Sequence, residues 1–288
     1  MRTGQKLSPT GRINLIDTRQ VEERFQQRGR GAISNQTGRF ELETRQAFDD
    51  GWGTIEDDDS RMETLLMKDS ARTIITFNKS PDISFDRTVN PYRGCEHGCI
   101  YCFARPTHAY LDLSPGLDFE SKLFAKPDAA QLLAETLAKP GYQARPIAMG
   151  TNTDPYQPIE GRYRITRAML EVCLDARHPV TITTKSDRVL ADLDILEEMA
   201  RKDLIAVAIS VTSLDPSLSR LVEPRAPSPT KRLAALGALT QAGVPTHCSI
   251  APVIPAITDD AMEGIVARSA ELGVTFAGWI PLRLPHEV

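Results

Sequence analysis

Short apolar runs alternate with longer stretches of helical periodicity over most of the chain. The short runs predict strands whose two faces are mainly apolar, as in parallel strands that helices cover on the outside. Between them, apolar stripes predict amphipathic helices. One such helix opens at Ser228 with Pro229 and stops at Gly243, and others start at Asp128 and Thr258. The six predicted strands are residues 83–89, 146–151, 179–184, 204–210, 246–251 and 274–280.

Six strands that alternate with helices require parallel pairing through right-handed crossovers. That arrangement is either a doubly wound sheet or a barrel, and periodicity does not choose between the two. In both, functional residues lie where strands end and loops begin. Polar or conformationally special residues follow every predicted strand, so we expect one active-site rim assembled from six loops.

The N-terminal quarter differs in character, and we assign residues 1–75 to a polar arm and residues 76–288 to the core domain. Residues 1–39 hold eight Lys and Arg against three acids, whereas residues 41–59 hold eight acids against one Arg. This composition cannot bury much apolar area, so we expect a mostly disordered arm. The net charge of the whole chain is -4, which argues against nucleic-acid binding by bulk charge alone.

The pattern contains neither an apolar run of 18 residues nor an N-terminal leader, so we expect no membrane contact and a cytoplasmic protein. Five cysteines among 288 residues are too few for a disulfide framework. Cys173 lies on the apolar stripe of a helix and Cys248 in a strand, and both are expected to be small buried core residues.

The other three cysteines form the sharpest motif, Cys95-x3-Cys99-x2-Cys102, flanked by Gly94 and Gly98. Three thiolates in eight residues can wrap around one compact inorganic group. A structural zinc ion needs four ligands, and His97 or His108 could supply the fourth. A [4Fe-4S] cluster held by three thiolates, with one iron left open, fits three cysteines better.

With Tyr101 just before the last cysteine, the motif resembles that of the radical S-adenosylmethionine (SAM) enzymes. The longer strings NPYRGCEHGCIYCFARPTHAYL, GTNTDPYQPIE, TTKS and EPRAPSP are similar to the subgroup related to spore photoproduct lyase. The resemblance covers residues 77–288. It implies an α/β fold, a partial (β/α)6 TIM-like barrel that is open on one side.

The resemblance also implies a reaction. The open iron would chelate the amino and carboxylate groups of SAM, and one electron would cleave SAM to a 5′-deoxyadenosyl radical that takes hydrogen from a substrate. The electron donor would be a protein such as flavodoxin or ferredoxin. The residue roles that it implies are iron ligation by Cys95, Cys99 and Cys102, adenine contact by Tyr101, ammonium binding by Thr153, Asp154 and Glu160, carboxylate binding by Lys185, and ribose contact by Ser210.

The substrate stays open, and a nucleic acid is one candidate. Spore photoproduct lyase returns hydrogen from a cysteine where this chain has Thr151, whose O–H bond is too strong for that step, so the resemblance does not transfer DNA repair. Arg225 and Arg283 border the rim and are candidate contacts for an anionic substrate. The alternative function is a non-catalytic zinc or iron-sulfur module that binds nucleic acid through the basic arm.

Overall fold

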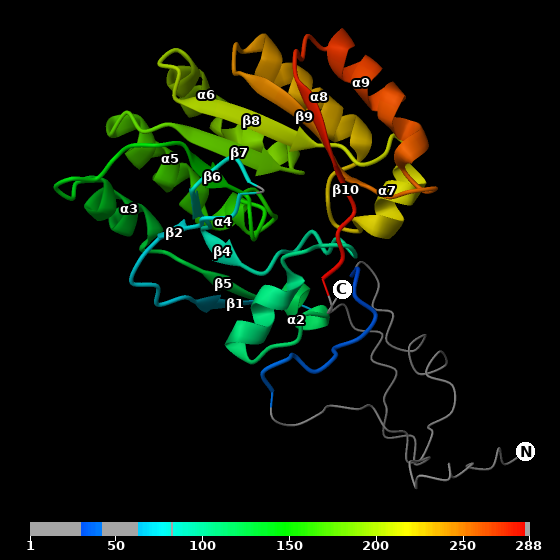
Figure 1. The fold of residues 1–288 in the computed structure, drawn as a ribbon, viewed down its shortest axis with the longest axis horizontal. Coiled ribbons are helices and arrows are strands. Elements are labelled where there is room, and N and C mark those ends of the chain that lie inside the picture. The colour runs from blue at the N-terminus through cyan, green and yellow to red at the C-terminus, as the bar shows by residue number, and fades with distance from the viewer. Residues whose placement is uncertain (1–29, 42–62, 82, 286–288) are drawn as a thin grey trace, which may run out of the picture.

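The structure is a computed structural model that describes residues 30–41, 63–81 and 83–285 (Figure 1). One large sheet carries helices along its outer side, and a smaller sheet lies beside it. The strands are β1 Leu65–Lys68, β2 Ile75–Phe77, β3 Arg87–Val89, β4 Tyr92–Arg93, β5 Lys122–Ala125, β6 Ile147–Met149, β7 Val180–Thr184, β8 Ile205–Ser210, β9 Thr246–Val253 and β10 Ala277–Pro281.

Helices connect these strands. The α-helices are α2 Leu117–Ser121, α3 Ala129–Leu137, α4 Glu160–Tyr163, α5 Ile165–Asp175, α6 Leu193–Ala200, α7 Pro216–Val222, α8 Pro229–Gln241 and α9 Met262–Glu271. The described residues also form the 3₁₀ helices Arg105–Leu111, Asp187–Asp192 and Asp259–Ala261, which lie in loops that follow strands.

The large sheet has the strand order β10-β9-β8-β7-β6-β3-β2. Its pairs from β3 to β10 are all parallel, and only β2 joins in the antiparallel direction, to β3. The order follows the chain without reversal, which is the arrangement of a (β/α) barrel, whereas a doubly wound sheet reverses direction at a switch point. The strand order therefore settles the alternative that periodicity left open.

All six predicted strands are present, and the α/β prediction is confirmed. The largest boundary error is in the first, because β3 begins only at Arg87 and Ile83 is 44% exposed in the preceding loop. The helix that we expected from Ser228 is α8, and the Ser228 side chain accepts a hydrogen bond from the Lys231 N–H. Asp128 also precedes a helix, but its carboxylate pairs with Lys68 at 3.0 Å and caps no N–H.

The second sheet, with the order β1-β5-β4, was not predicted. β1 pairs in parallel with β5, so residues 65–68, which the sequence placed in the arm, belong to the folded body. Residues 30–41 also contact the folded body, because Gly31 and Asn35 donate hydrogen bonds to the carboxylates of α2. The other arm residues, 1–29 and 42–62, lie outside the described part of the chain, and so does the prediction that they are disordered.

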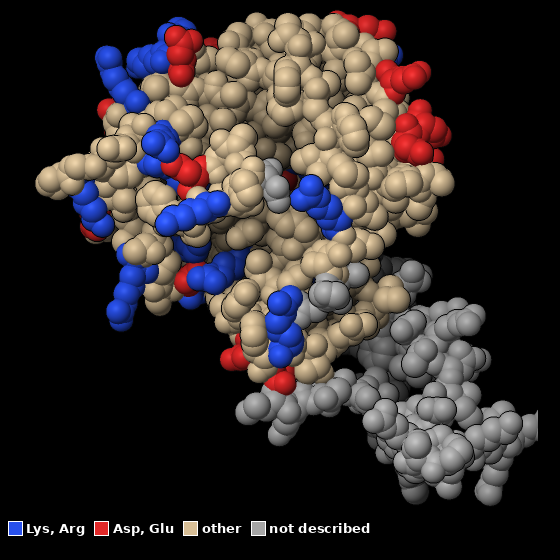
Figure 2. Space-filling view, in the orientation of Figure 1, with Lys and Arg blue, Asp and Glu red and all other residues tan. Residues whose placement is uncertain are grey.

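The two faces of the large sheet differ. The core residues Ile182, Val207 and Ile209 face the outer helices and are at most 1% exposed. The alternate residues Thr181 and Thr183 of the central strand β7 are exposed, so the inner face is open to solvent. The space-filling view shows the molecule hollowed near its centre, with Asp and Glu gathered over α9 (Figure 2).

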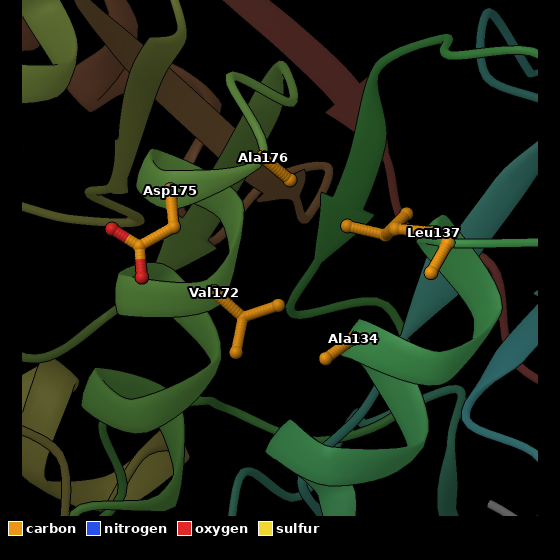
Figure 3. A pocket seen from close by; sticks show the side chains of 6 residues that line it. Ala134, Leu137, Val172, Asp175 and Ala176 are labelled. Atoms are coloured by element: carbon orange, nitrogen blue, oxygen red, sulfur yellow. The ribbon is translucent and has the colours of Figure 1, made fainter.

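A shallow pocket lies on the outer side, between α3 and α5 (Figure 3). Asp175 is its one ionisable lining residue, and Ala134, Leu137 and Val172 supply apolar walls. This pocket is lined by helices and not by the loops after the strands, so we assign it no part in the candidate site. No described helix has the length and apolar character needed to cross a membrane.

Candidate functional site

The three motif cysteines lie on residues 94–104, which we call the cysteine loop, between β4 and the 3₁₀ helix Arg105–Leu111. Backbone hydrogen bonds fix both its sides: the Cys95 N–H donates to Phe119 O at 3.0 Å and the Ile100 N–H to Val222 O at 3.0 Å. The Arg105 guanidinium donates twice to Cys99 O, at 2.8 and 3.1 Å. The loop is therefore anchored to three segments that follow it in the chain.

The three thiols form no disulfide, and Cys95 and Cys99 are buried. Burial raises the pKa of all three, that of Cys99 to about 12, and the charges of Cys99 and Cys102 also raise the pKa of Cys95. Sulfurs that interact so strongly and are so poorly hydrated need a cation to stay ionised. An iron-sulfur cube supplies one, and it binds each sulfur at a separate iron, so the donor set fits that group.

The described residues contain no group of three Cys, His, Asp or Glu side chains arranged to hold one metal ion. The two histidines considered as a fourth zinc ligand have other partners. His97 Nδ1 lies 3.3 Å from Asp154 Oδ2, and His108 Nε2 lies 2.9 Å from Lys122 O. These contacts use one nitrogen of each ring, as in histidines that bind zinc through the other, so they do not distinguish the two groups, and the three thiolates are what favours the cluster.

Side chains of the loop after β6 form hydrogen bonds with the start of the cysteine loop. The Thr153 hydroxyl donates to Gly94 O at 2.6 Å, and the Gln157 amide donates to the same oxygen at 3.2 Å. Gln157 Oε1 in turn accepts the Glu96 N–H at 2.9 Å. Thr153 therefore lies at the site, as expected, but its hydroxyl proton is committed to the loop backbone.

Asp154, in the loop after β6, contacts several neighbouring segments through its carboxylate. Its carboxylate accepts the Thr184 hydroxyl at 2.6 Å and the Lys185 N–H at 2.8 Å, in addition to its contact with His97. Burial by itself would raise the pKa of Asp154, but His97 and these hydrogen bonds outweigh burial and lower it to about 2. A permanently ionised carboxylate thus ties the cysteine loop to the end of β7.

The phenol of Tyr101 is hydrogen-bonded to a buried carboxylate, that of Glu223. The Tyr101 hydroxyl donates to Glu223, and Thr212 Oγ1 donates to the same oxygen at 2.9 Å. Arg232 forms an ion pair with the other oxygen of Glu223, and both side chains are at most 1% exposed. Burial would raise the pKa of Glu223, but Arg232 and Lys185 lower it to about 2.

Lys185 directly follows β7, and its side chain lies near Tyr101 and Glu223. Its Nζ lies 5.8 Å from the Tyr101 ring centroid, 3.8 Å from Glu223 Oε1 and 3.3 Å from Ala251 O. Its charge lowers the pKa of both Cys99 and Cys102, against the larger effect of burial. The structure therefore brings together four of the predicted site residues: Cys99, Tyr101, Cys102 and Lys185.

Glu160 has a different environment. Its Oε1 accepts the N–H groups of Thr166 and Arg167, and its Oε2 accepts the Ile165 N–H and the Tyr92 hydroxyl. The three N–H groups belong to the first turn of α5, and a helix leaves the N–H groups of its first turn without partners inside the helix. The geometry favours a helix-capping role for Glu160 over the ammonium contact that the resemblance implied.

The other predicted rim residues are spread around the site. Ser210 ends β8, is 3% exposed, and accepts Arg232 Nη1 through its carbonyl at 3.2 Å. Arg225 lies against the cysteine loop, since its N–H donates to His97 O at 3.2 Å and its guanidinium to Glu96 at 3.4 Å. Arg283 is exposed beyond β10. Cys173 and Cys248 are fully buried in the core, which confirms their assignment.

Sequence reasoning did not identify Glu223, Arg232, Arg105 or Glu120 as part of the site. Glu223 stands in the EPRAPSP string, two residues before the Arg225 that we singled out. Arg232 directly precedes Leu233 in α8, and no local pattern distinguishes it from the exposed Lys231 beside it.

Comparison with known proteins gives the same assignment. A sequence model described as the radical SAM superfamily matches residues 89–268. An uncharacterized protein of Mycobacterium tuberculosis is 41% identical over 209 residues, which are 70% of this chain and 62% of that protein. One of Methanocaldococcus jannaschii is 30% identical over 200 residues, 69% of this chain and 71% of that protein. The chain thus spans about 62% of the length of its mycobacterial relatives.

Two solved structures of spore photoproduct lyase variants are similar in fold. One has a TM-score of 0.59 at 17% identity and covers 77% of this chain and 63% of that chain. The other, described with bound AdoMet and dinucleoside spore photoproduct, has a TM-score of 0.58 at 16% identity and covers 77% of this chain and 63% of that chain. At this identity the likeness shows the fold, and it agrees with the predicted partial barrel.

Proposed function

Because the chain belongs to the radical SAM superfamily and is thus an enzyme of the radical SAM class, we propose that Cys95, Cys99 and Cys102 hold a [4Fe-4S] cluster whose fourth iron binds SAM. When bound, the cluster would supply the electron that splits SAM into methionine and a 5′-deoxyadenosyl radical. The single observation that carries this assignment is the juxtaposition of Lys185 with Cys99, Cys102 and Tyr101.

The chain's own residues would bind and orient SAM. Among the described residues, Lys185 is the side-chain cation whose charge lowers the pKa of two of the thiols, and it suits the methionine carboxylate. Asp154 fixes the Lys185 backbone, and Glu223 fixes the Tyr101 ring. Ser210, at the end of the neighbouring strand β8, would contact the ribose.

The substrate is proposed only as a class. The dinucleoside bound in the similar lyase structure makes a nucleic acid one candidate. By the resemblance, Thr151 stands where the lyase has its hydrogen-returning thiol, and its Oγ1 accepts the Asn90 amide at 3.2 Å. All five cysteines are accounted for by the cysteine loop and the core, so the chain has no further thiol for such a step. We therefore propose a reaction other than thiol-dependent photoproduct repair, with a ferredoxin or flavodoxin as the electron donor.

Anaerobic reconstitution tests this function. We expect about four iron and four sulfide per chain and release of 5′-deoxyadenosine on addition of dithionite and SAM. Cys99→Ala should lose both properties, whereas Cys173→Ala, a change to a buried thiol in the core, should keep them. A colourless wild-type protein that binds zinc and does not cleave SAM would exclude the proposal.

A further inference from the structure

A segment far ahead of the cysteine motif lies against the cysteine loop. We call residues 30–38 the strap, and it runs beside α2 (Figure 1). The Gly31 N–H donates to Glu120 Oε2 at 2.9 Å and the Ala32 N–H to Glu120 Oε1 at 2.8 Å. Further along, the Leu117 N–H donates to Ser34 O at 3.2 Å. The strap is thus held along α2 by its backbone, and the Asn35 side chain adds a hydrogen bond to Asp118 Oδ1 at 3.0 Å.

Glu120 connects the strap to a cluster ligand. Its carboxylate is fully buried and forms an ion pair with Arg105. The Arg105 guanidinium donates to Cys99 O through both Nε and Nη2. A continuous chain of charge-assisted hydrogen bonds therefore runs from the backbone of residues 31–32 through Glu120 and Arg105 to the middle cysteine of the motif.

The strap also contacts the loop directly. A Cβ atom added at Gly31 would collide with the carbonyl oxygen of Gly98, and one added at Gly98 would lie 2.6 Å from Glu120 Oε2. Gly98 has φ +67°, a conformation that favours glycine. The Arg30 guanidinium donates to Glu120 O at 2.6 Å and to Thr64 Oγ1 at 3.2 Å, and Thr64 donates to Glu96 Oε1 at 2.7 Å.

We propose that the strap is part of the cluster site and that Glu120 is a positioning residue, which holds the cysteine loop in place from behind. The cluster part of this inference rests on the proposed function, but the support of the loop does not. A glycine at position 31 is required because the two backbones approach too closely for any side chain. Residues 30–38, which the sequence assigned to the polar arm, thus contribute to the site.

Hydrogen exchange on the full-length metal-free protein tests the support of the loop. In Gly31→Ala and in Glu120→Gln we expect the amides of residues 94–104 to exchange about tenfold faster than in the wild type, since the loop loses its anchor. The matched control is Gly264→Ala on α9, where an added Cβ meets only the Leu214 side chain, at 3.1 Å. Unchanged exchange of the loop in both variants would overturn the proposal.

The reconstituted protein gives two further measurements. Release of iron to a chelator should be roughly tenfold faster in Gly31→Ala and in Glu120→Gln, as for other residues that support metal ligands. Glu120→Gln should also move the reduction potential of the cluster to a more positive value, because a negative charge beside the thiolates is lost. If the wild type binds no cluster, the proposed function fails, and the exchange data still decide whether the strap holds the loop.

Discussion

The phenol of Tyr101 donates its hydrogen bond to Glu223, a residue 122 positions later in the chain. The aromatic residue of the cysteine motif is thereby fixed by a carboxylate that no local pattern connects to it. Two other buried phenols have the same kind of partner, since Tyr92 donates to Glu160 and Tyr156 donates to Asp192. Pairs of this kind fix the loops at the ends of the strands before any ligand binds.

Glu223 and Arg232 should be strongly coupled. Removal of one partner leaves the other charge buried, so we expect Glu223→Gln and Arg232→Met each to lower the free energy of unfolding by about 3–5 kcal/mol. The double variant should lose clearly less than the sum of the two, because neither charge remains. Urea unfolding of all four proteins measures the coupling, and additive losses would mean that the ion pair contributes nothing.

Lys185 should act on SAM and not on the cluster. Lys185→Met is expected to weaken SAM binding about tenfold or more, through loss of a charge-assisted contact, while the iron content stays near that of the wild type. Lys79→Met, which removes an exposed lysine, is the control. Titration with SAM under anaerobic conditions measures both variants. Equal affinity in the Lys185 variant and the wild type would show that another residue binds the carboxylate.

The six parallel strands of the large sheet, β3 and β6 to β10, could be predicted because helices cover them, so their apolar character persists along the strand. β1 and β2 have only four and three residues and lack such a pattern. Their pairing depends on distant partners, which local periodicity does not encode. The sequence did predict that a polar loop follows each of the six strands. Because these strands are neighbours in one parallel sheet, their loops lie at the same edge.

Within the site, residues next to a strand end were predictable, but their hydrogen-bond partners were not. Asp154 was expected to bind a ligand ammonium, and in the structure it already accepts three protein groups from the cysteine loop and β7. Glu160 and Asp154 look equivalent in the sequence, and only the fold reveals that Glu160 caps α5. Arg105 and Glu120 were missed because they bind backbone groups, the Cys99 carbonyl and the N–H groups of residues 31–32, which leave no mark in the sequence.

Gly150 should tolerate a side chain much less well than Gly141, although both have positive φ, +93° and +79°. A Cβ at Gly150 would collide with Thr183 O in the neighbouring strand, whereas Gly141 has nothing within 4 Å of that position. We expect Gly150→Ala to cost about 3 kcal/mol of unfolding free energy and Gly141→Ala about 1 kcal/mol. Similar losses on chemical denaturation would contradict the close approach of β6 and β7.

Glu160 should make the stability of the protein fall as the pH rises. Burial raises its pKa to about 7, against the opposing effects of the Tyr92 and backbone hydrogen bonds. Its pKa in the unfolded chain is about 4.3, so between these values the folded state binds more protons than the unfolded state. The contribution is therefore complete below about pH 4 and is lost as the pH rises toward 7, with a slope of up to about 1.4 kcal/mol per pH unit.

Glu160→Gln isolates this effect, because the amide cannot ionise while neighbouring groups such as Asp192 still titrate. The difference in unfolding free energy between wild type and variant should shift in favour of the variant from pH 5 to pH 7 and change little from pH 7 to pH 8. Urea midpoints at four pH values measure it. If the difference were constant over this range, Glu160 would be ionised throughout, and the four donors around it would outweigh its burial.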